Sequence, residues 1–338
     1  MIGLKDYYSW KRGQKFLGVK YPIIAGAMTW ISDSRLVTSV GKAGGFGVFA
    51  AGNMSVNKFK KEIKVLKEKK INFAVNLITI APNYKKQLQL IIELGIPFVV
   101  FVGGFPRKVD IKVAKESGSK VMCFASTESI AQRMIDYGAD ALILEGCEAG
   151  GHIGYVSTIV LIQQVLFNFP EIPIFIAGGI ATGKMIAHLF LMGAAGVQMG
   201  TIFAVSEESP AHSRFKDRFI KARAREAFAT PQYDSLLPII PVRAIKNKGT
   251  EEFGKLQLNL LQRLENQEIT QLEAQYIVEE FWLGALQRAV EQGDIEKGSL
   301  MAGQSVGLVK KIKNTKNIIN DLLEEAEAEF FHIQQLLK

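Results

Sequence analysis

The sequence predicts a closed (β/α)8 barrel of the TIM type with an inserted, mostly helical cap. Eight short apolar, β-branched segments recur between residues 23 and 203, and helix-like segments lie between them. The strand-like segments are almost continuously apolar, which indicates burial on both faces, as in a barrel surrounded by helices. A doubly wound open sheet is the alternative, but eight regular units within about 180 residues favour closure.

Each predicted strand has about the usual length of a strand. The eight segments are IIAGAM (23–28), FGVFAA (46–51), FAVNLI (73–78), FVVFVG (98–103), KVMCFA (120–125), ALILEG (141–146), IPIFIAGG (172–179) and GVQMGTIF (196–203). Helices are predicted between them, for example over 34–44, 83–95, 128–138 and 183–193. Several of these helical segments end on a glycine, which suits a left-handed C-cap.

The rhythm of strands and helices stops after Phe203, and residues 204–300 are predicted to form loops and helices. Within this part, 262–293 is helix-like, and a final amphipathic helix is predicted from about Thr315. We therefore expect three segments. They are a barrel (1–223), a helical substrate cap (224–304) and a C-terminal helical segment that returns to the barrel (305–338).

The composition is that of a globular protein, with 48% hydrophobic and 22% charged residues. The N-terminal segment is too charged for a secretory signal, and no apolar run approaches the roughly 18 residues of a membrane span. We therefore expect a cytoplasmic protein without a membrane or nucleic-acid partner. Cys123 and Cys147 lack metal-ligand spacing, so we expect two reduced thiols and no metal.

Two glycine-containing segments stand where barrels commonly bind phosphate, at the ends of the seventh and eighth strands. They are AGGIATG (177–183), which leads into a helix, and MGT (199–201). Glycine permits close backbone approach, and N–H groups at a helix start bind anions. The ligand-binding candidates in these two segments are Ala177, Gly178, Gly179, Met199, Gly200 and Thr201. The alternative is that these glycines serve only tight turns.

A histidine among glycines follows the sixth strand, in EGCEAGGHIG (145–154). The glycines beside it, Gly151 among them, leave His152 free to face a ligand, and imidazole can donate or accept a proton near neutral pH. His152 is therefore the predicted catalytic residue. The alternative is a histidine that only ties down its loop.

Polar residues at strand ends are the remaining candidates. We expect one of Glu145, Cys147 and Glu148 to reach the site, and Glu145 could bind a ligand hydroxyl or support its loop. Asn76 lies in an otherwise apolar strand and requires a hydrogen-bond partner if it is buried. Ligand contact and internal bracing are both open for Asn76.

Taken in order, these motifs resemble those of a known superfamily, the FMN-dependent nitronate monooxygenases and enoyl-ACP reductases II. The matching segments are PIIAGAM (22–28), GGFG (44–47), FAVN (73–76), EAGGHIG (148–154), AGGI (177–180) and VQMGTIF (197–203). The resemblance extends over nearly the whole chain. It implies that FMN lies at the carboxyl ends of the strands, with Ala27, Met28 and Asn76 along the flavin.

Three longer stretches are most similar to the enoyl-ACP reductase II (FabK type) branch: 145–165, VRAIKN (242–247) and 293–309. This similarity implies reduction of a trans-2-enoyl thioester in fatty acid synthesis, with NADH or NADPH as electron donor. It also implies that acyl carrier protein delivers the substrate and that His152 lies at the substrate face. The segment 228–247 departs from the family pattern where the acyl pocket is expected.

Two other functions are open at this point. One is nitronate monooxygenase activity, in which O2 oxidises alkyl nitronates with the same flavin and histidine. The other is a non-catalytic flavin-binding protein. A branch with an iron–sulfur cluster would need four cysteines, and the chain has 2.

Positive side chains are expected to dock an acidic carrier protein, because the formal charge is +8. The candidates are Lys221, Arg223, Arg225, Arg243, Lys246 and Lys248. The sequence does not determine the oligomeric state, and a homodimer is one of the assemblies it allows.

Overall fold

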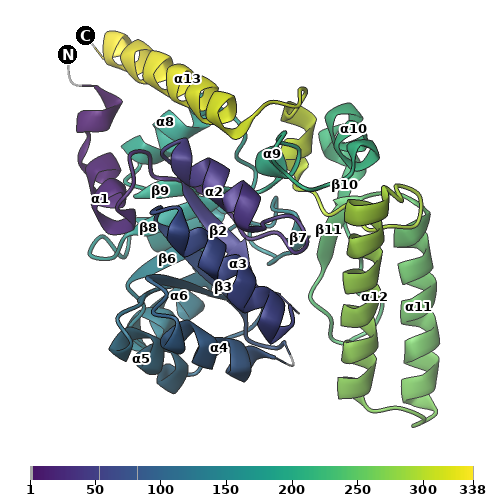
Figure 1. Ribbon diagram of the computed structural model, residues 1–338. Coiled ribbons are helices and arrows are strands. Elements are labelled where there is room, and N and C mark those ends of the chain that lie inside the picture. The colour runs from purple at the N-terminus through teal and green to yellow at the C-terminus, as the bar shows by residue number, and fades with distance from the viewer. Residues whose placement is uncertain (1–2, 53, 82, 338) are drawn as a thin grey trace.

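The computed structural model describes residues 3–52, 54–81 and 83–337, and a barrel of eight parallel strands lies at its centre (Figure 1). The strands, in barrel order, are β1 (Ile23–Ala25), β2 (Phe46–Ala50), β3 (Phe73–Ile78), β4 (Phe98–Val102), β5 (Lys120–Ala125), β6 (Ala141–Glu145), β8 (Ile174–Ala177) and β9 (Gly196–Met199). The barrel closes where β1 pairs with β9, with Ile24 opposite Gln198. The predicted fold class is confirmed, and all eight predicted segments contain a barrel strand.

Helices alternate with the strands and cover the barrel. They are α2 (Ser34–Lys42), α3 (Val56–Glu68), α4 (Tyr84–Glu93), α5 (Lys108–Glu116), α6 (Glu128–Asp136), α7 (Thr158–Leu161) with the π-helical turn Ile162–Leu166, and α8 (Gly183–Leu191). The predicted glycine ends are confirmed for four helices, because Gly44, Gly95, Gly138 and Gly193 follow them with positive φ.

Two apolar layers hold the barrel together. One lies inside the barrel and includes Ile24, Ala74 and Ile143, and the other lies between the strands and the helices. The preceding helix α1 (Tyr8–Leu17) closes the amino-terminal end, where the ring of Phe16 lies 5.9 Å from the rings of Phe98 and Phe175. The carboxyl-terminal end is therefore the open end of the barrel.

The cap follows α9 (Thr201–Ala204) and α10 (Ser213–Lys221). It contains β10 (Ala227–Ala229), β11 (Val242–Ile245), α11 (Lys248–Glu265) and α12 (Gln271–Gln292), and the two long helices lie side by side beside the barrel (Figure 1). A separate apolar cluster, with Phe253, Val278 and Trp282 at its centre, holds them together.

Two expectations for the cap are wrong. Residues 204–300 contain the strands β10 and β11 as well as loops and helices. The helix predicted over 262–293 is two helices, because α11 ends at Glu265 and α12 begins after Thr270. Gln267 has φ 57°, which interrupts the helical backbone, and Thr270 and Glu273 form a capping box that begins the second helix.

The last helix, α13 (Thr315–Leu336), confirms the predicted amphipathic end and lies along α8, near the N-terminal segment (Figure 1). Its Glu325 accepts a hydrogen bond from the backbone N–H of Gly183, and its Glu329 contacts His188. Both contacts dock α13 on the outside of the barrel. Across the described ranges, no helix is long and apolar enough to cross a membrane.

Candidate active site

Three polar side chains face the barrel interior at its open end. Ala74 and Ile143 belong to the interior cluster, so strand alternation turns Asn76 and Glu145, two residues further on, to the same side. Gln198 on β9 lies between two residues of the outer layer and therefore also faces inward. The three side chains form a polar layer above the apolar interior.

This polar layer lacks hydrogen-bond partners among the residues that the structure describes. Asn76 and Gln198 are only 7% and 8% exposed, and within the described part of the chain no protein group hydrogen-bonds their side chains or that of Glu145. Burial raises the pKa of Glu145 to about 8, so at pH 7 this carboxyl is mostly neutral and can donate a hydrogen bond. Buried polar groups rarely remain unpaired, so the open end of the barrel suits a polar ligand.

Gln198 was not among the residues predicted from the sequence. It carries the same signal as Asn76, because it is a lone polar residue in the apolar strand VQMG.

Ala27 and Met28 lie on the loop after β1. Ser32 braces this loop, because its hydroxyl accepts from the Met28 N–H at 3.0 Å and donates to the Gly26 carbonyl at 3.0 Å. The sulfur of Met28 lies 3.5 Å from the point where a Cβ on Gly200 would stand. The β1 and β9 loops therefore meet at the open end of the barrel.

The glycine loop after β8 has a backbone conformation that favours glycine and brings backbone groups close together. Gly178 and Gly179 have φ +93° and +75°, and a Cβ on Gly178 would lie 2.9 Å from the Gly146 carbonyl oxygen. The following helix start is already occupied, since the N–H of Gly183 donates to Glu325. The loop, rather than the first turn of α8, is therefore available to an anion.

The second glycine segment lies at the junction of β9 and α9. The N–H groups of Thr201 and Ile202 precede any acceptor within α9. The Thr201 hydroxyl accepts a hydrogen bond from the Gly303 N–H at 3.1 Å. A Cβ on Gly303 would lie 2.8 Å from the Glu148 carbonyl oxygen, so the segment MAGQ (301–304) packs closely against the histidine loop. The sequence had identified this segment only as a family motif.

His152 lies on β7 (Gly151–His152), a short strand between the barrel and the cap (Figure 1). It pairs with Val242 of β11, and its Nε2 lies 3.2 Å from a carboxylate oxygen of Glu279 on α12. The histidine loop thus follows a barrel strand in the chain, but its short strand pairs with the sheet of the cap. Neither β7 nor Glu279 was predicted from the sequence.

Arg243 is not the docking residue that the sequence predicted. It is 7% exposed, its Nε donates to the Cys147 carbonyl at 3.0 Å, and its Nη1 donates to the Ala227 carbonyl at 2.7 Å. The register places it opposite Gly151, inside the junction between loop and cap. Its guanidinium braces this junction instead of meeting a partner.

Glu145, Cys147 and Glu148, the three candidates at the end of β6, differ in what their side chains contact. The Glu148 carboxylate accepts from the Thr158 N–H and hydroxyl, at 3.0 and 2.9 Å, and so supports the start of α7. Cys147 is a free, half-buried thiol, and Cys123 is free and buried. Glu145 is therefore the candidate of the three that faces the open end of the barrel.

The nitronate monooxygenase family model matches residues 11–325 of this chain. The chain belongs to this family. Its structure superposes on that of FabK from Thermotoga maritima with a TM-score of 0.85 and 35% sequence identity. The match covers 96% of this chain and 98% of FabK. A probable nitronate monooxygenase from Staphylococcus saprophyticus is 28% identical, with 87% of this chain and 91% of the relative covered. This nitronate monooxygenase family member is a flavin-dependent oxidoreductase.

A third relative has a name that specifies a CoA thioester. It is named (3aS,4S,5R,7aS)-5-hydroxy-7a-methyl-1-oxo-octahydro-1H-indene-4-carboxyl-CoA dehydrogenase and comes from Mycobacterium tuberculosis. It is 26% identical, and the match covers 92% of this chain and 94% of the relative.

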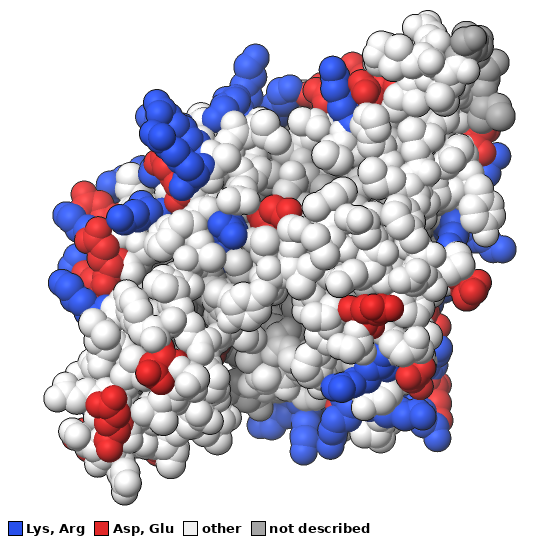
Figure 2. Space-filling view, turned by 180° about the vertical axis from the view of Figure 1, so that it is seen from behind, with Lys and Arg blue, Asp and Glu red and all other residues white. Residues whose placement is uncertain are grey.

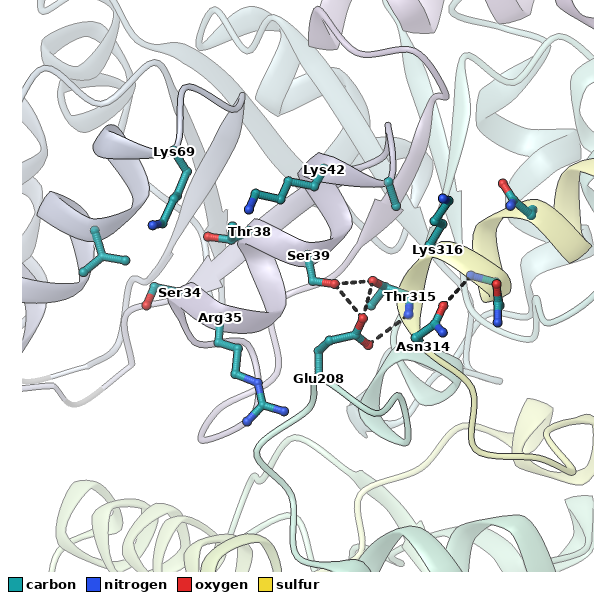
Figure 3. A pocket seen from close by; sticks show the side chains of 14 residues that line it. Ser34, Arg35, Thr38, Ser39, Lys42, Lys69, Glu208, Asn314, Thr315 and Lys316 are labelled. Atoms are coloured by element: carbon teal, nitrogen blue, oxygen red, sulfur yellow. Dashed lines mark hydrogen bonds between the residues drawn. The ribbon is translucent and has the colours of Figure 1, made fainter.

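A surface hollow of about 1020 Å³ lies away from this family site, between α2, α3 and the start of α13 (Figure 3). Three of its polar residues bind one another: the Glu208 carboxylate accepts from the Ser39 hydroxyl at 2.9 Å and the Thr315 N–H at 2.9 Å. Burial would raise the pKa of Glu208, but these hydrogen bonds outweigh it and lower the pKa. These hydrogen bonds attach the start of α13 to α2 through Glu208.

Proposed function

We propose that this protein is a cytoplasmic, FMN-dependent reductase that uses NADH or NADPH to reduce trans-2-enoyl groups on acyl carrier protein. The observation that carries the proposal is the likeness to FabK at 35% identity over 96% of the chain. The name of the mycobacterial relative contains a carboxyl-CoA, which is also an acyl thioester. A thioester-linked acyl substrate is consistent with both, and the direction of reduction rests on the likeness to FabK.

The residues at the open end of the barrel fit FMN. Asn76 and Gln198 are buried amides with no hydrogen-bond partner in the described part of the chain, and they can donate and accept, as the polar edge of a flavin ring requires. Gly178, Gly179 and the α9 start offer backbone N–H groups to a phosphate. When bound, FMN would supply the redox chemistry, namely hydride transfer from NADH or NADPH to the β-carbon of the enoyl group.

His152 is the proposed catalytic residue of the chain. Reduction of the double bond also needs a proton at the α-carbon, and it is favoured when the thioester carbonyl is hydrogen-bonded. The imidazole can serve in either role, since His152 is half-exposed between barrel and cap. The cap, proposed to span 224–304, excludes water around the acyl chain.

The test of this role is His152→Ala. The variant should keep its bound flavin but lose turnover with an enoyl thioester by about 100-fold or more, the usual scale for a positioned acid or base. Flavin content is read from the absorbance spectrum, and turnover from the oxidation of NADH. Full turnover would show that His152 only supports its loop, and loss of flavin would show that it is structural.

Nitronate oxidation is the second candidate function, because the family model and the staphylococcal relative both carry that name. It would use the same flavin and the same histidine, with O2 as electron acceptor. The two functions differ in the compound that reduces the flavin.

A further inference from the structure

We propose that Glu279 of α12 is a positioning residue, which holds the ring of His152 with its hydrogen on Nε2 and leaves Nδ1 to the substrate. The inference rests on the proposed function, because it assumes that His152 faces the acyl thioester. It also gives the cap a second role, since the group that orients the histidine lies on a cap helix.

The geometry of the contact selects one ring nitrogen. Nε2 of His152 lies 3.2 Å from Oε1 of Glu279. A carboxylate has no hydrogen to donate, so the imidazole must supply it from Nε2. In the neutral ring, Nδ1 then keeps a lone pair, and in the charged ring it carries a second N–H. In both forms Nδ1 is the ring nitrogen that remains available to a ligand.

The backbone of His152 is held by the same cap. Val242 of β11 pairs with His152, and the N–H of Ile153 donates to the Pro241 carbonyl at 3.0 Å. Arg243 adds its hydrogen bonds to the Cys147 and Ala227 carbonyls. The cap sheet therefore fixes where the ring is attached, and α12 fixes how the ring is turned.

Glu279 itself is held on a rigid part of α12. Its neighbours Val278 and Trp282 are 2% exposed each and lie in the apolar cluster of the cap. The side chains of His152 and Glu279 are 37% and 40% exposed, and ion pairs as exposed as this contribute little to stability. The contact is therefore better suited to orienting a ring than to holding the fold together.

The structure offers matched variants. Glu279→Ala removes the acceptor, whereas Glu279→Gln keeps the length and an acceptor oxygen without the charge. Glu280→Ala removes the same charge from the next residue, which is exposed. We expect Glu279→Ala to slow reoxidation of the reduced flavin by crotonyl thioester about 10-fold, less than the loss expected for His152→Ala. Glu279→Gln should remain within about 3-fold of the wild type, and Glu280→Ala should not change the rate.

A second readout needs no turnover. In protein labelled with ¹⁵N in histidine, the ring nitrogens of His152 are assigned by their loss in His152→Ala. The wild type should show hydrogen on Nε2 alone, and Glu279→Ala should show averaging between the two ring nitrogens. Reduction of the flavin by NADH and the flavin content should be the same in all variants.

Each outcome decides the proposal. An unchanged ring pattern in Glu279→Ala, or an equal loss of rate in Glu280→Ala, would overturn the positioning role. If Glu279→Ala fails to fold, a large rate loss in the isosteric Glu279→Gln would overturn it instead. If the wild type does not reduce the thioester while its ring pattern responds to Glu279, the proposed substrate is wrong and the orienting contact stands.

Discussion

The chemistry of Glu145 depends on the layer of the barrel in which its carboxyl lies. Apolar side chains surround this layer, and burial raises the pKa of Glu145 from the ordinary 4.5 to about 8. A neutral carboxyl that faces the same interior as Asn76 and Gln198 presents a donor and an acceptor without adding charge. This arrangement is consistent with a hydrogen-bond donor to the bound flavin.

The same pKa predicts how stability changes with pH. Between pH 4.5 and about 8 the unfolded chain has lost the Glu145 proton that the folded protein keeps, so the free energy of unfolding falls as pH rises through this window. Glu145→Gln cannot titrate. We therefore compare the free energies of unfolding of the flavin-free variant and the flavin-free wild type. The difference in favour of the variant should grow as pH rises from 5 to 8 and stay constant above pH 8.

Denaturant unfolding of the flavin-free protein at pH 5, 7 and 9 measures this difference. Glu280→Gln, at an exposed position, is the control and should follow the wild type. A constant difference between Glu145→Gln and the wild type across these pH values would contradict the assigned burial of the carboxyl.

Single residues also show how far sequence reasoning reaches. Asn76 was identified because a polar residue interrupts an apolar strand, and the same rule would have found Gln198. Glu279 could not have been identified, because its partner lies 127 residues away in the sequence. Arg243 was misassigned because a basic residue in a proline-containing segment resembles a surface charge until its strand register is known.

At the scale of elements, the junction of β9 and α9 is the clearest test of the phosphate site. Gly200 has φ −110°, which any residue adopts, and a Cβ there would make only ordinary contacts with Met28, at 3.5 Å and beyond. Gly179 is a poorer probe, since its φ of +75° strains any side chain. Gly200 therefore separates ligand binding from folding.

We expect Gly200→Val to fold and to purify with little or no FMN, because the side chain would enter the space assigned to the ligand. Gly284→Val on α12 is a control, since a Cβ there meets only the end of Arg288 at 3.6 Å. Flavin absorbance per polypeptide and the melting temperature are the measurements. Full FMN content in a folded Gly200→Val would move the cofactor phosphate elsewhere.

The barrel elements were predicted well because each βα unit repeats the same local pattern. The cap elements were not, because β7, β10 and β11 are 2, 3 and 4 residues long. Strands this short carry no usable periodicity, and their pairing joins segments far apart in the sequence. The histidine loop was recognised from its composition, but its attachment to the cap was not.

At the scale of the whole molecule, charge bears on the proposed carrier. On the face shown in Figure 2, Lys and Arg gather toward the margins, and the middle carries few charged side chains. Of the predicted docking residues, Lys221, Arg223, Arg225 and Lys246 are exposed. Lys248 is exposed as well and pairs with Glu296 at 3.0 Å, whereas Arg243 is buried and is not retained as a docking residue.

Charges at the edge of a binding site chiefly speed encounter, and salt screens them as the Debye length falls from about 10 Å at 0.1 M to about 3 Å at 1 M. We expect kcat/KM for crotonyl-ACP to fall with salt more steeply than that for crotonyl-CoA. Lys246→Glu should raise KM for the carrier substrate alone, whereas Lys60→Glu, exposed on α3, should not. Parallel salt responses would remove these residues as the docking surface.

Anaerobic mixing most directly tests the proposal that NADH or NADPH reduces the flavin and that the reduced flavin then reduces an enoyl thioester. The purified wild-type protein is mixed without O2 with NADH or NADPH, and crotonyl thioester is added once the flavin absorbance is constant. We expect rapid bleaching of the flavin by at least one of the two nicotinamides and recovery of the oxidised spectrum after the thioester is added. Bleaching by an alkyl nitronate alone, with no response to either nicotinamide, would contradict it.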